Sequence, residues 1–378
     1  HNISNIFDYT IFSMKIALVS DFFHPTLGGI ATHMEDLANE LIKRGHDVYV
    51  IAKKGYHNDS RFKFKVIRVD TILKTYGPLD VPKIKELKKV IEKIDPDVVH
   101  SHHMFSPLSL LSLKMGYENG SKTVVTNHSI QVFYDIDYFW RPTSYILLPH
   151  KYYLNYADEI VAVSNAAKDF VKKFIERDDI HVIPNGIFVD DFKPKKKVFN
   201  GKDVLFVGRL VHRKGVQTAL KAIKYVRKGI KDVRLTIIGK GYMEHYVHLM
   251  KNVLSIKRNV VLRTDVDSKK KLAKYYRNSN VFIAPSLYGE SFGIVILEAM
   301  ASMTPPIASY QGGIKEIIDH GKTGFMFSRR NAKKLAEYIE ILLTDKKLWS
   351  KMSKNAYRES KKYDWKKVVK QIEKVYKN

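Results

Sequence analysis

The 378-residue chain contains no cysteine, and none of its apolar runs reaches the ~18 residues that a transmembrane helix needs. The lack of cysteine excludes disulfide bonds and thiolate chemistry, and with them a small secreted protein held together by disulfides. The lack of a long apolar run predicts that no segment crosses a bilayer. Residues 1–13 lack the basic start and the apolar core of a signal peptide, so we interpret them as an upstream extension or a cloning remnant. The expected location is the cytoplasm.

Acidic residues are scarce compared with basic ones. The 39 Asp and Glu residues stand against 65 Lys and Arg residues, which gives a formal charge of +26. This excess predicts an anionic partner, and nucleic acid, a membrane surface and phosphorylated substrates all fit it. Peripheral association with the cytoplasmic face of a membrane is therefore one hypothesis for this chain.

The length and the order of the apolar segments predict two domains. At ~100–200 residues per domain, the chain is long enough for two. Short apolar runs alternate with helical periodicity in both halves of the chain, which predicts an α/β fold of two doubly wound parallel sheets in tandem. The expected bounds are 14–183 for the first domain, 184–200 for a linker, 201–362 for the second domain and 363–378 for an amphipathic terminal helix.

A glycine pair follows the first predicted strand. Gly28 and Gly29 lie between the strand 15–21 and the helix 30–44, and this unit lacks the G-x-G-x-x-G fingerprint of dinucleotide-binding domains. Glycine at this point lets the backbone approach a phosphate or a sugar closely. A tight turn without a ligand explains the pair equally well.

Several histidines lie where predicted strands of the first domain end. They are His100, His102, His103 and His128. Ligands of open α/β sheets bind outside the carboxyl ends of the strands, which makes these side chains candidates for ligand contact. A single histidine is more often structural, and His-x-His without a nearby cysteine or carboxylate pair is a weak zinc signal.

The stretch Pro285–Met300 combines a strand end with a helix start. It follows the apolar run Val281–Ala284 and resumes with helical periodicity after Gly293. Such a junction presents backbone N–H groups and the positive end of the helix dipole to an anionic ligand such as a phosphate ester. Glu290 and Glu298 are separated by seven residues and are expected to flank one ligand, although glutamates in ion pairs are the alternative.

Two cations precede this stretch in the second domain. Arg209 and Lys214 lie at the end of a predicted strand and the start of a predicted helix, and together they suit a diphosphate. Arg213 competes with Lys214 for this role.

Taken in order, these motifs resemble those of retaining GT-B glycosyltransferases of family GT4. The matching segments are Gly208-Arg209-Leu210 with Lys214-Gly215, Gly239-Lys240-Gly241, and Glu290-x7-Glu298. The resemblance implies the GT-B fold, in which two Rossmann-like domains face each other across a cleft and a terminal helix crosses back to the first domain. It also implies transfer of a hexose or N-acetylhexosamine from a nucleotide diphosphate sugar to a hydroxyl acceptor, with retention of configuration and no further cofactor.

The family pattern gives a role to each matching residue. Arg209 and Lys214 would bind the donor diphosphate, Glu290 the donor sugar, and Glu298 the ribose hydroxyls. His128 ends a predicted strand just before the aromatic stretch, so we expect it at the cleft, in contact with the donor sugar or the acceptor hydroxyl, and we count it with Glu290, Arg209 and Lys214 as catalytic. The other donor-site residues that the resemblance implies are Gly28, Gly29, Gly239, Gly241, Ser291, Phe292 and Gly293.

Within the family, the N-terminal motifs are most similar to the catalytic subunits that transfer N-acetylglucosamine to phosphatidylinositol. These motifs are the segment 20–25, Gly28-Gly29, His100-Ser101-His102 and Thr126-Asn127-His128-Ser129. The family usually has Asp where this chain has Asn127. The resemblance implies a UDP-sugar such as UDP-N-acetylglucosamine as the donor, and a lipid headgroup or inositol phosphate as the acceptor.

Aromatic and basic residues interleave between Val132 and Tyr156. This composition suits a membrane interface or a lipid-bearing acceptor, and it equally suits a pair of helices packed over the sheet. The residues expected on the acceptor side are His24, His102, Tyr134 and Trp140.

No metal site is predicted. Asp265-Val266-Asp267 resembles the metal-binding D-x-D of GT-A glycosyltransferases, but it directly precedes Ser268 and a predicted helix over 269–277, so helix capping explains it more simply.

Two other functions stay open at this point. A basic nucleic-acid-binding protein fits the charge, although the sequence has no RRM, OB-fold or helix-turn-helix signature. A nucleotide-sugar epimerase or a phosphorylase fits the same architecture.

Overall fold

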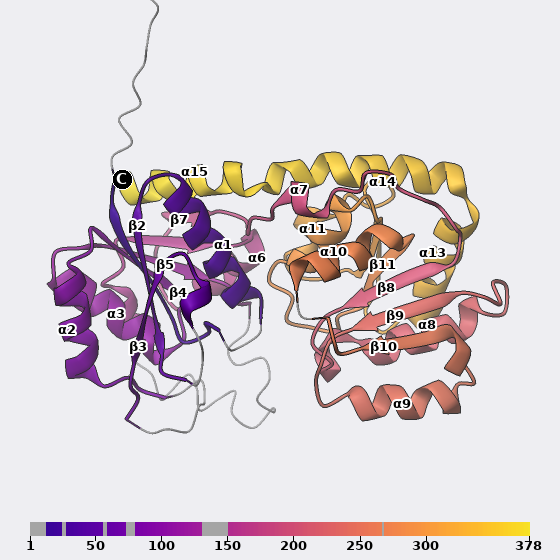
Figure 1. Ribbon diagram of the computed structural model, residues 1–378, viewed down its shortest axis with the longest axis horizontal. Coiled ribbons are helices and arrows are strands. Elements are labelled where there is room, and N and C mark those ends of the chain that lie inside the picture. Colours follow the sequence, from indigo (N-terminus) through magenta and orange to yellow (C-terminus); the bar gives the residue numbers. More distant parts are fainter. Residues whose placement is uncertain (1–12, 25–27, 56–58, 73–79, 131–149, 267) are drawn as a thin grey trace, which may run out of the picture.

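The computed structural model describes residues 13–24, 28–55, 59–72, 80–130, 150–266 and 268–378. Two parallel sheets lie side by side, each covered by helices (Figure 1). The strand order is β3-β2-β1-β4-β5-β6-β7 in the first sheet and β10-β9-β8-β11-β12-β13 in the second. The prediction of two Rossmann-like, doubly wound α/β domains is therefore confirmed.

The first sheet and its helices occupy the N-terminal half of the chain. Its strands are β1 (Lys15–Ser20), β2 (Asp47–Lys53), β3 (Lys65–Val69), β4 (Val98–His102), β5 (Lys122–Asn127), β6 (Glu159–Ala162) and β7 (Ile180–Val182). Its helices are α1 (Gly29–Lys43), α2 (Ile84–Ile94), α3 (Pro107–Glu118), α5 (His150–Leu154) and α6 (Asn165–Val171).

The second sheet follows after the short helix α7 (Val189–Phe192). Its strands are β8 (Asp203–Val207), β9 (Arg234–Ile238), β10 (Val260–Arg263), β11 (Val281–Ala284), β12 (Pro306–Ser309) and β13 (Phe325–Phe327). Its helices are α8 (Val216–Val226), α9 (Glu244–Val253), α10 (Lys269–Asn278), α11 (Ile294–Ala301), α12 (Ile314–Ile317), α13 (Ala332–Thr344) and α14 (Lys346–Ser360), and the chain ends with α15 (Trp365–Lys377).

The central strands explain why these sheets form. From Ile16 to Val19 and from Val281 to Ala284, every side chain is buried, as expected for parallel strands that are covered on both faces. The strand order reverses between β1 and β4 in the first sheet and between β8 and β11 in the second. Ligands of such sheets bind at the carboxyl ends of the strands beside this reversal. The loops after β1, β4, β8 and β11 are therefore where a site is expected.

Helix α15 packs on the first domain, although it follows the second domain in sequence (Figure 1). Its Trp365 is fully buried in a cluster with Leu37 and Ile183. A side chain at Gly186 would come within 2.4 Å of the Trp365 ring, so only glycine fits there. Helix α14 instead contacts α11 of the second domain. The end of the chain thus joins the two domains.

Polar bonds fix α15 in place. Glu373 accepts hydrogen bonds from Arg44 Nη2 at 2.8 Å and pairs with His46 Nε2 at 3.0 Å. The Tyr376 hydroxyl lies 2.7 Å from His100 Nδ1. His100, one of the strand-end histidines, is thereby part of this attachment.

The observed helices begin close to their predicted starts. Helix α2 begins at Ile84, two residues after Pro82, because Pro82 forms an isolated bridge with Thr71 and Lys83 is extended. Most of the aromatic stretch, including Tyr134 and Trp140, lies outside the described residues. At its described end, α5 packs on α3 and the His150 ring is buried against Phe105, 5.2 Å between centroids. This end matches the packed-helix alternative.

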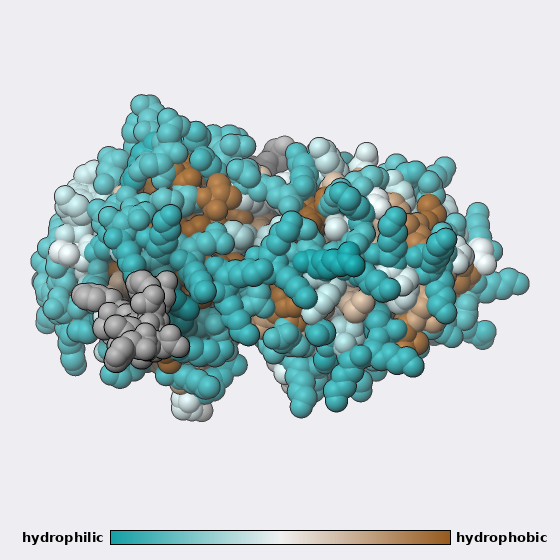
Figure 2. All heavy atoms as spheres, turned by 90° about the horizontal axis from the view of Figure 1, so that it is seen from above, coloured by the Kyte–Doolittle hydropathy of each residue, from teal (hydrophilic) through white to brown (hydrophobic). Residues whose placement is uncertain are grey.

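The surface is mainly hydrophilic on the side of α14 and α15. Figure 2 shows that apolar side chains there form small, separate patches. Among the described helices, none combines the length and the apolar character needed to cross a bilayer.

Candidate active site

An ion pair lies at the carboxyl ends of β8 and β11. Lys214 Nζ is 2.7 Å from Glu290 Oε2, and the Ser286 hydroxyl donates to the same oxygen at 3.1 Å. Both charged side chains are less than one-fifth exposed. Arg213, on the same short 3-10 turn as Lys214, is buried, while Arg209 is exposed at the end of β8. The structure thus brings together three of the predicted residues and the competing arginine.

Burial and neighbouring charges act on this pair in opposite directions. Burial lowers the pKa of Lys214, and the nearby Arg213 and Arg209 lower it further, whereas Glu290 raises it without cancelling these effects. Burial favours the neutral form of Glu290, but Lys214, Arg213 and Ser286 outweigh it and hold the pKa of Glu290 below its usual value. Glu290 is therefore a carboxylate at neutral pH, held in a fixed position by its donors.

The glycines predicted to lie near the phosphates are required by the packing of two loops. A Cβ at Gly239 would lie 1.9 Å from the carbonyl oxygen of Gly208, and one at Gly241 would lie 2.4 Å from that of Leu210. Both residues also have positive φ angles. The loops after β8 and β9 can approach this closely only without side chains, so ligand contact by these glycines stays a prediction.

The turn that carries Glu290 is held by the second glycine pair. Gly313 N–H donates to the Glu290 carbonyl at 3.2 Å, and a Cβ at Gly312 would lie 2.0 Å from that oxygen. Gly293 then starts α11 with a φ of 106°. Phe292 is buried, with its ring 5.9 Å from that of Tyr363. The loop geometry that presents Glu290 is therefore fixed by backbone contacts.

Glu298 has different surroundings from Glu290. It is buried in α11, where the Tyr276 hydroxyl donates to Oε2 at 2.8 Å. Burial raises the pKa of Glu298 to about 7. Glu298 lines a narrow pocket between the domains together with His33, Asp36 and Lys269. The two glutamates are thus bound to different partners, and their expected joint contact with one ligand stays a prediction.

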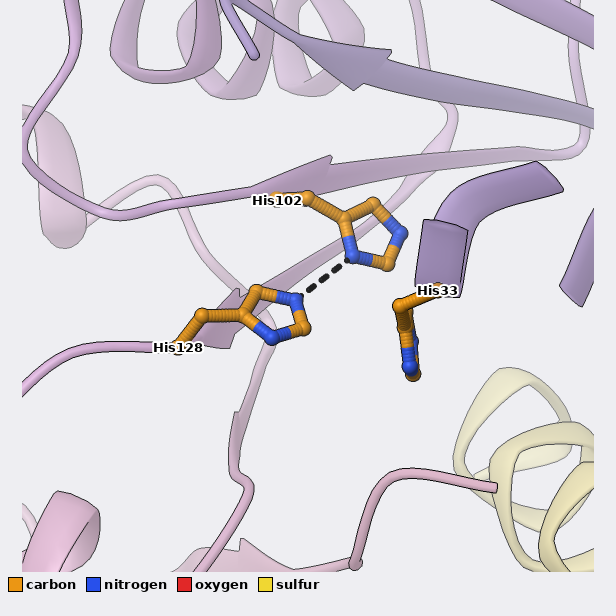
Figure 3. Close-up of side chains that lie close together, drawn as sticks. All are labelled: His33, His102 and His128. Carbon is orange, nitrogen blue, oxygen red and sulfur yellow. Dashed lines mark hydrogen bonds between the residues drawn. The ribbon is translucent and has the colours of Figure 1, made fainter. Parts of the chain in front are cut away.

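On the first-domain side, three buried histidines lie close together (Figure 3). His102 ends β4 and His128 follows β5, and His102 Nδ1 is 3.1 Å from His128 Nε2. His33 faces both from α1, with ring centroids 5.4 Å from His102 and 4.8 Å from His128. Burial lowers the pKa of His33 to about 3 and those of His102 and His128 well below 6.5, so all three rings are neutral at pH 7.

Asn127 has a clear role where the family usually has Asp. Its Nδ2 donates to the carbonyls of Ser129 and Ala167 at 2.8 and 3.1 Å, and its Oδ1 accepts from Ser129 N–H at 3.1 Å. An ionised carboxylate cannot donate the first two bonds. The amide therefore shapes the turn that carries His128.

The remaining predicted residues of this side lie near the start of α1. Gly29 lies across from α11, because a Cβ there would be 3.7 Å from Ile294 Cδ1, while a Cβ at Gly28 would meet open space. His24 Nε2 is 2.8 Å from Glu35 Oε2. Gly29 thus faces the second domain, and His24 is held by a carboxylate of α1.

Several contacts between the domains were not predicted from the sequence. Asp36 of α1 forms an ion pair with Lys269 of α10. Glu316 accepts from the N–H groups of Asn165 and Ala166 at the start of α6, at 3.0 and 3.2 Å, and Ser164 Oγ donates to the Ser291 carbonyl at 2.7 Å. These residues are distant in sequence and follow no motif, so only the fold identifies them.

The D-x-D segment is only partly described. Asp267 lies outside the described residues, and Ser268 Oγ caps α10 by accepting from Lys271 N–H at 3.3 Å. The predicted helix therefore begins here, with serine as its cap.

Two family models match the chain in succession. The model described as "Glycosyltransferase Family 4" matches residues 27–191, and that described as "Glycosyl transferases group 1" matches residues 189–359. The first covers the histidine cluster and the second covers the Lys214–Glu290 pair. Their boundary coincides with α7, between the two sheets.

Similar proteins agree with this assignment. A phosphatidyl-myo-inositol mannosyltransferase of Mycobacterium leprae is 27% identical, over 96% of this chain and 96% of that protein. The phosphatidylinositol N-acetylglucosaminyltransferase GPI3 subunit of Saccharomyces cerevisiae is 26% identical, over 96% of this chain and 83% of that protein. In fold, the chain is similar to HepE of Anabaena, solved with UDP and glucose, with a TM-score of 0.76 at 19% identity, over 97% of this chain and 100% of that one. The chain belongs to the family 4 glycosyltransferases of GT-B fold.

Proposed function

We propose that this protein transfers a hexose or N-acetylhexosamine from a nucleotide diphosphate sugar, with a UDP-sugar favoured, to a hydroxyl of an inositol phospholipid, with retention of configuration. The observation that carries the proposal is the Lys214–Glu290 pair, flanked by Arg213 and by Arg209 at the carboxyl ends of β8 and β11. This arrangement supports binding of a diphosphate beside a sugar.

The charges suit the bond that breaks. As the glycosidic bond to the diphosphate is cleaved, negative charge grows on the leaving oxygen, and Lys214, Arg209 and the N-terminus of α11 are positioned to stabilise it. Because a diphosphate is a stable anion, it leaves without taking up a proton. Glu290, already a carboxylate that accepts hydrogen bonds from Lys214 and Ser286, then orients the hydroxyls of the sugar.

Neutral histidines suit the other half of the reaction. The acceptor hydroxyl must lose a proton, and neutral imidazole offers a lone pair that can accept a hydrogen bond from it. Ile130, two residues after His128, lies against Gly312 of the second domain, since its Cδ1 would be 3.1 Å from a Cβ there. This contact supports placing His128 near the donor sugar.

The acceptor is inferred from two relatives and one surface. The printed names of the mycobacterial and yeast proteins share phosphatidylinositol and differ in the sugar, which favours this headgroup while leaving the sugar open. Helix α2 carries the exposed lysines Lys85, Lys88, Lys89 and Lys93 on the first domain, and the exposed Lys83 directly precedes it. Such a helix attracts an anionic lipid surface by roughly 1 kcal/mol for each nearby lysine.

The donor and the product can be identified together. Binding of UDP-, GDP- and ADP-sugars is measured first, and the best donor is then incubated with phosphatidylinositol, inositol phosphate and free inositol. Mass spectrometry of the products and the coupling constant of the anomeric proton are expected to show one added α-linked sugar on phosphatidylinositol. A β-linked product would contradict retention, and transfer to soluble acceptors alone would contradict the lipid.

Vesicle co-sedimentation tests the membrane surface separately. The protein is expected to bind anionic and not zwitterionic vesicles, with weakening by salt and by Trp140→Ala. Reversing two charges in Lys85→Glu/Lys89→Glu should cost at least about 2 kcal/mol, roughly thirtyfold in affinity. The matched control is Lys346→Glu/Lys347→Glu, which makes the same charge change on the second domain at two exposed positions of α14. If both double variants lose vesicle affinity equally, the binding depends on net charge and not on the lysines of α2.

A further inference from the structure

Two of the three histidines in Figure 3, His33 and His102, have buried ring nitrogens without a hydrogen-bond partner among the described residues. Among the described residues, neither ring nitrogen of His33 has a hydrogen-bond partner, nor does Nε2 of His102. His33 and His102 are 4% and 0% exposed. A buried polar atom without a partner costs free energy, so the unpaired nitrogens of His33 and His102 indicate a ligand-binding site.

The geometry fits a metal ion better than a further hydrogen bond. One nitrogen from each of His33, His102 and His128 lies within 4.8 Å of the other two. A tetrahedral ion with bonds of ~2.05 Å would bring its ligand nitrogens about 3.4 Å apart, so the rings would move closer together and the His102–His128 hydrogen bond would give way to bonds with the ion. Figure 3 shows the three rings close together, contributed by α1, the end of β4 and the loop after β5, with His102 and His128 joined by a hydrogen bond.

We propose that His33, His102 and His128 bind a divalent transition-metal ion such as Zn²⁺, and that the bound ion inhibits sugar transfer. Three imidazoles select zinc, cobalt, nickel or copper over magnesium and calcium, which prefer oxygen ligands. The sequence predicted no metal site here because no cysteine or carboxylate pair lies near His100-Ser101-His102 in the chain. Helix α1 supplies that partner, because β1 and β4 are neighbours in the sheet.

Inhibition follows from the use of His128, and this part rests on the proposed function. A nitrogen bound to a metal ion cannot accept a hydrogen bond from an acceptor hydroxyl. Metal-bound histidines usually donate their other N–H to a carboxylate or carbonyl. His33 shares its pocket with Asp36 and Glu298 and packs on the Trp365 ring at 5.1 Å between centroids, but among the described residues neither carboxylate is hydrogen-bonded to it. Without such support we expect reversible binding, suited to inhibition and release.

Binding is tested on the full chain without reference to activity. The protein is stripped with EDTA, dialysed, and titrated with Zn²⁺ against a chromophoric chelator, and Co²⁺ is added in parallel to record its visible spectrum. We expect one tight Zn²⁺ site and a tetrahedral Co²⁺ spectrum. His33→Leu replaces the imidazole with an apolar side chain of similar size. The affinity for Zn²⁺ should fall at least about 100-fold, which is more than the loss of an outer-shell partner costs.

The control addresses metal binding by other histidines. His245 and His248 are exposed one turn apart on α9, and His245→Ala/His248→Ala should leave the tight site intact. Loss of the site in this double variant, or equal Zn²⁺ affinity in wild type and His33→Leu, would overturn the proposal. Should His33→Leu fail to fold by circular dichroism, His33→Gln takes its place in the same comparison.

The link to transfer is measured last. Zn²⁺ should slow the wild-type transferase reversibly and leave His33→Leu unaffected, and equal inhibition of both would refute the inhibitory role. If no sugar donor supports transfer while His33→Leu still abolishes tight Zn²⁺ binding, the metal site stands and the proposed function fails.

Discussion

The two sides of the domain interface satisfy their polar groups in opposite ways. On the second domain, Lys214 and Glu290 form an ion pair that Ser286 supports with a further hydrogen bond. On the first domain, His33, His102 and His128 are neutral and deeply buried, and several of their nitrogens lack a partner in the described residues. The second-domain side therefore presents an ion pair, and the first-domain side presents neutral imidazole rings with unpaired nitrogens.

This difference fits the two halves of a transfer reaction. A departing diphosphate brings charge, and a site that holds fixed cations need not reorganise when that charge grows. An acceptor hydroxyl brings a proton, for which a neutral imidazole is the better partner. In the proposed function the two kinds of chemistry lie on separate sheets, so that each can be altered alone.

The largest effect is expected from Lys214→Ala. This substitution leaves Glu290 without its ion-pair partner. It also removes the cation that would stabilise the leaving diphosphate, so turnover should fall about 10²–10³-fold. Binding of the diphosphate sugar should weaken more than that of the free nucleoside. Steady-state kinetics and calorimetry check this, with Lys221→Ala on the exposed face of α8 as the matched control.

A double-mutant cycle sharpens the same prediction. Glu290→Ala should mainly lower turnover, and because the two side chains are bonded, the losses in Lys214→Ala/Glu290→Ala should not add. Additive losses would mean that the pair acts as two independent groups.

Glu298 gives the next largest effect, on stability and its pH dependence. The buried Glu298 carboxyl has a pKa of about 7, against an ordinary value of 4.5, so between these two pH values the folded protein holds a proton that the unfolded chain has lost. Stability should therefore fall as pH rises from about 4.5 to about 7, by about 3 kcal/mol at ~1.36 kcal/mol per pH unit.

Glu298→Gln removes this titration and keeps an acceptor for Tyr276. The variant should gain about 2–3 kcal/mol over wild type between about pH 5 and about pH 8, measured by urea unfolding. A constant difference between the two proteins across this range would show that Glu298 is not a buried acid. Because the resemblance gives Glu298 the ribose, Glu298→Ala should also weaken donor binding by about 1.5–3 kcal/mol.

A smaller effect is expected from Arg209→Ala, because this side chain is exposed at the end of β8. Its loss should weaken the diphosphate sugar by about 1.5 kcal/mol, the lower end for a hydrogen bond to a charged group, and leave the free nucleoside nearly unchanged. Calorimetry with both ligands measures the difference. Equal losses would argue against contact with the phosphates.

The smallest expected effect is that of EDTA. Protein cations and a helix N-terminus are available to neutralise the diphosphate, so chelation should leave the rate unchanged, or raise it where an inhibitory ion is stripped from the histidines. Loss of activity on chelation, restored by Mn²⁺ or Mg²⁺, would show that the charged side of the interface is incomplete without a metal ion.

The sequence by itself determined the architecture and the position of the second-domain loops. Continuous apolar runs such as Val281–Ala284 specify buried parallel strands, and glycines such as Gly293 mark helix starts, because both signals are local in the chain. Glu290 and Glu298 could be singled out for the same reason, since their spacing is a property of one segment.

The tertiary structure alone decided which groups meet. Lys214 and Glu290 are 76 positions apart, His33 and His102 come from α1 and β4, and Glu373 binds Arg44 across nearly the whole chain. Periodicity and local motifs carry no information on such pairs, because they depend on which strands are neighbours in each sheet and on the return of α15 to the first domain. The histidine cluster, and with it the proposed metal site, exists only because β1 lies beside β4 and β4 beside β5.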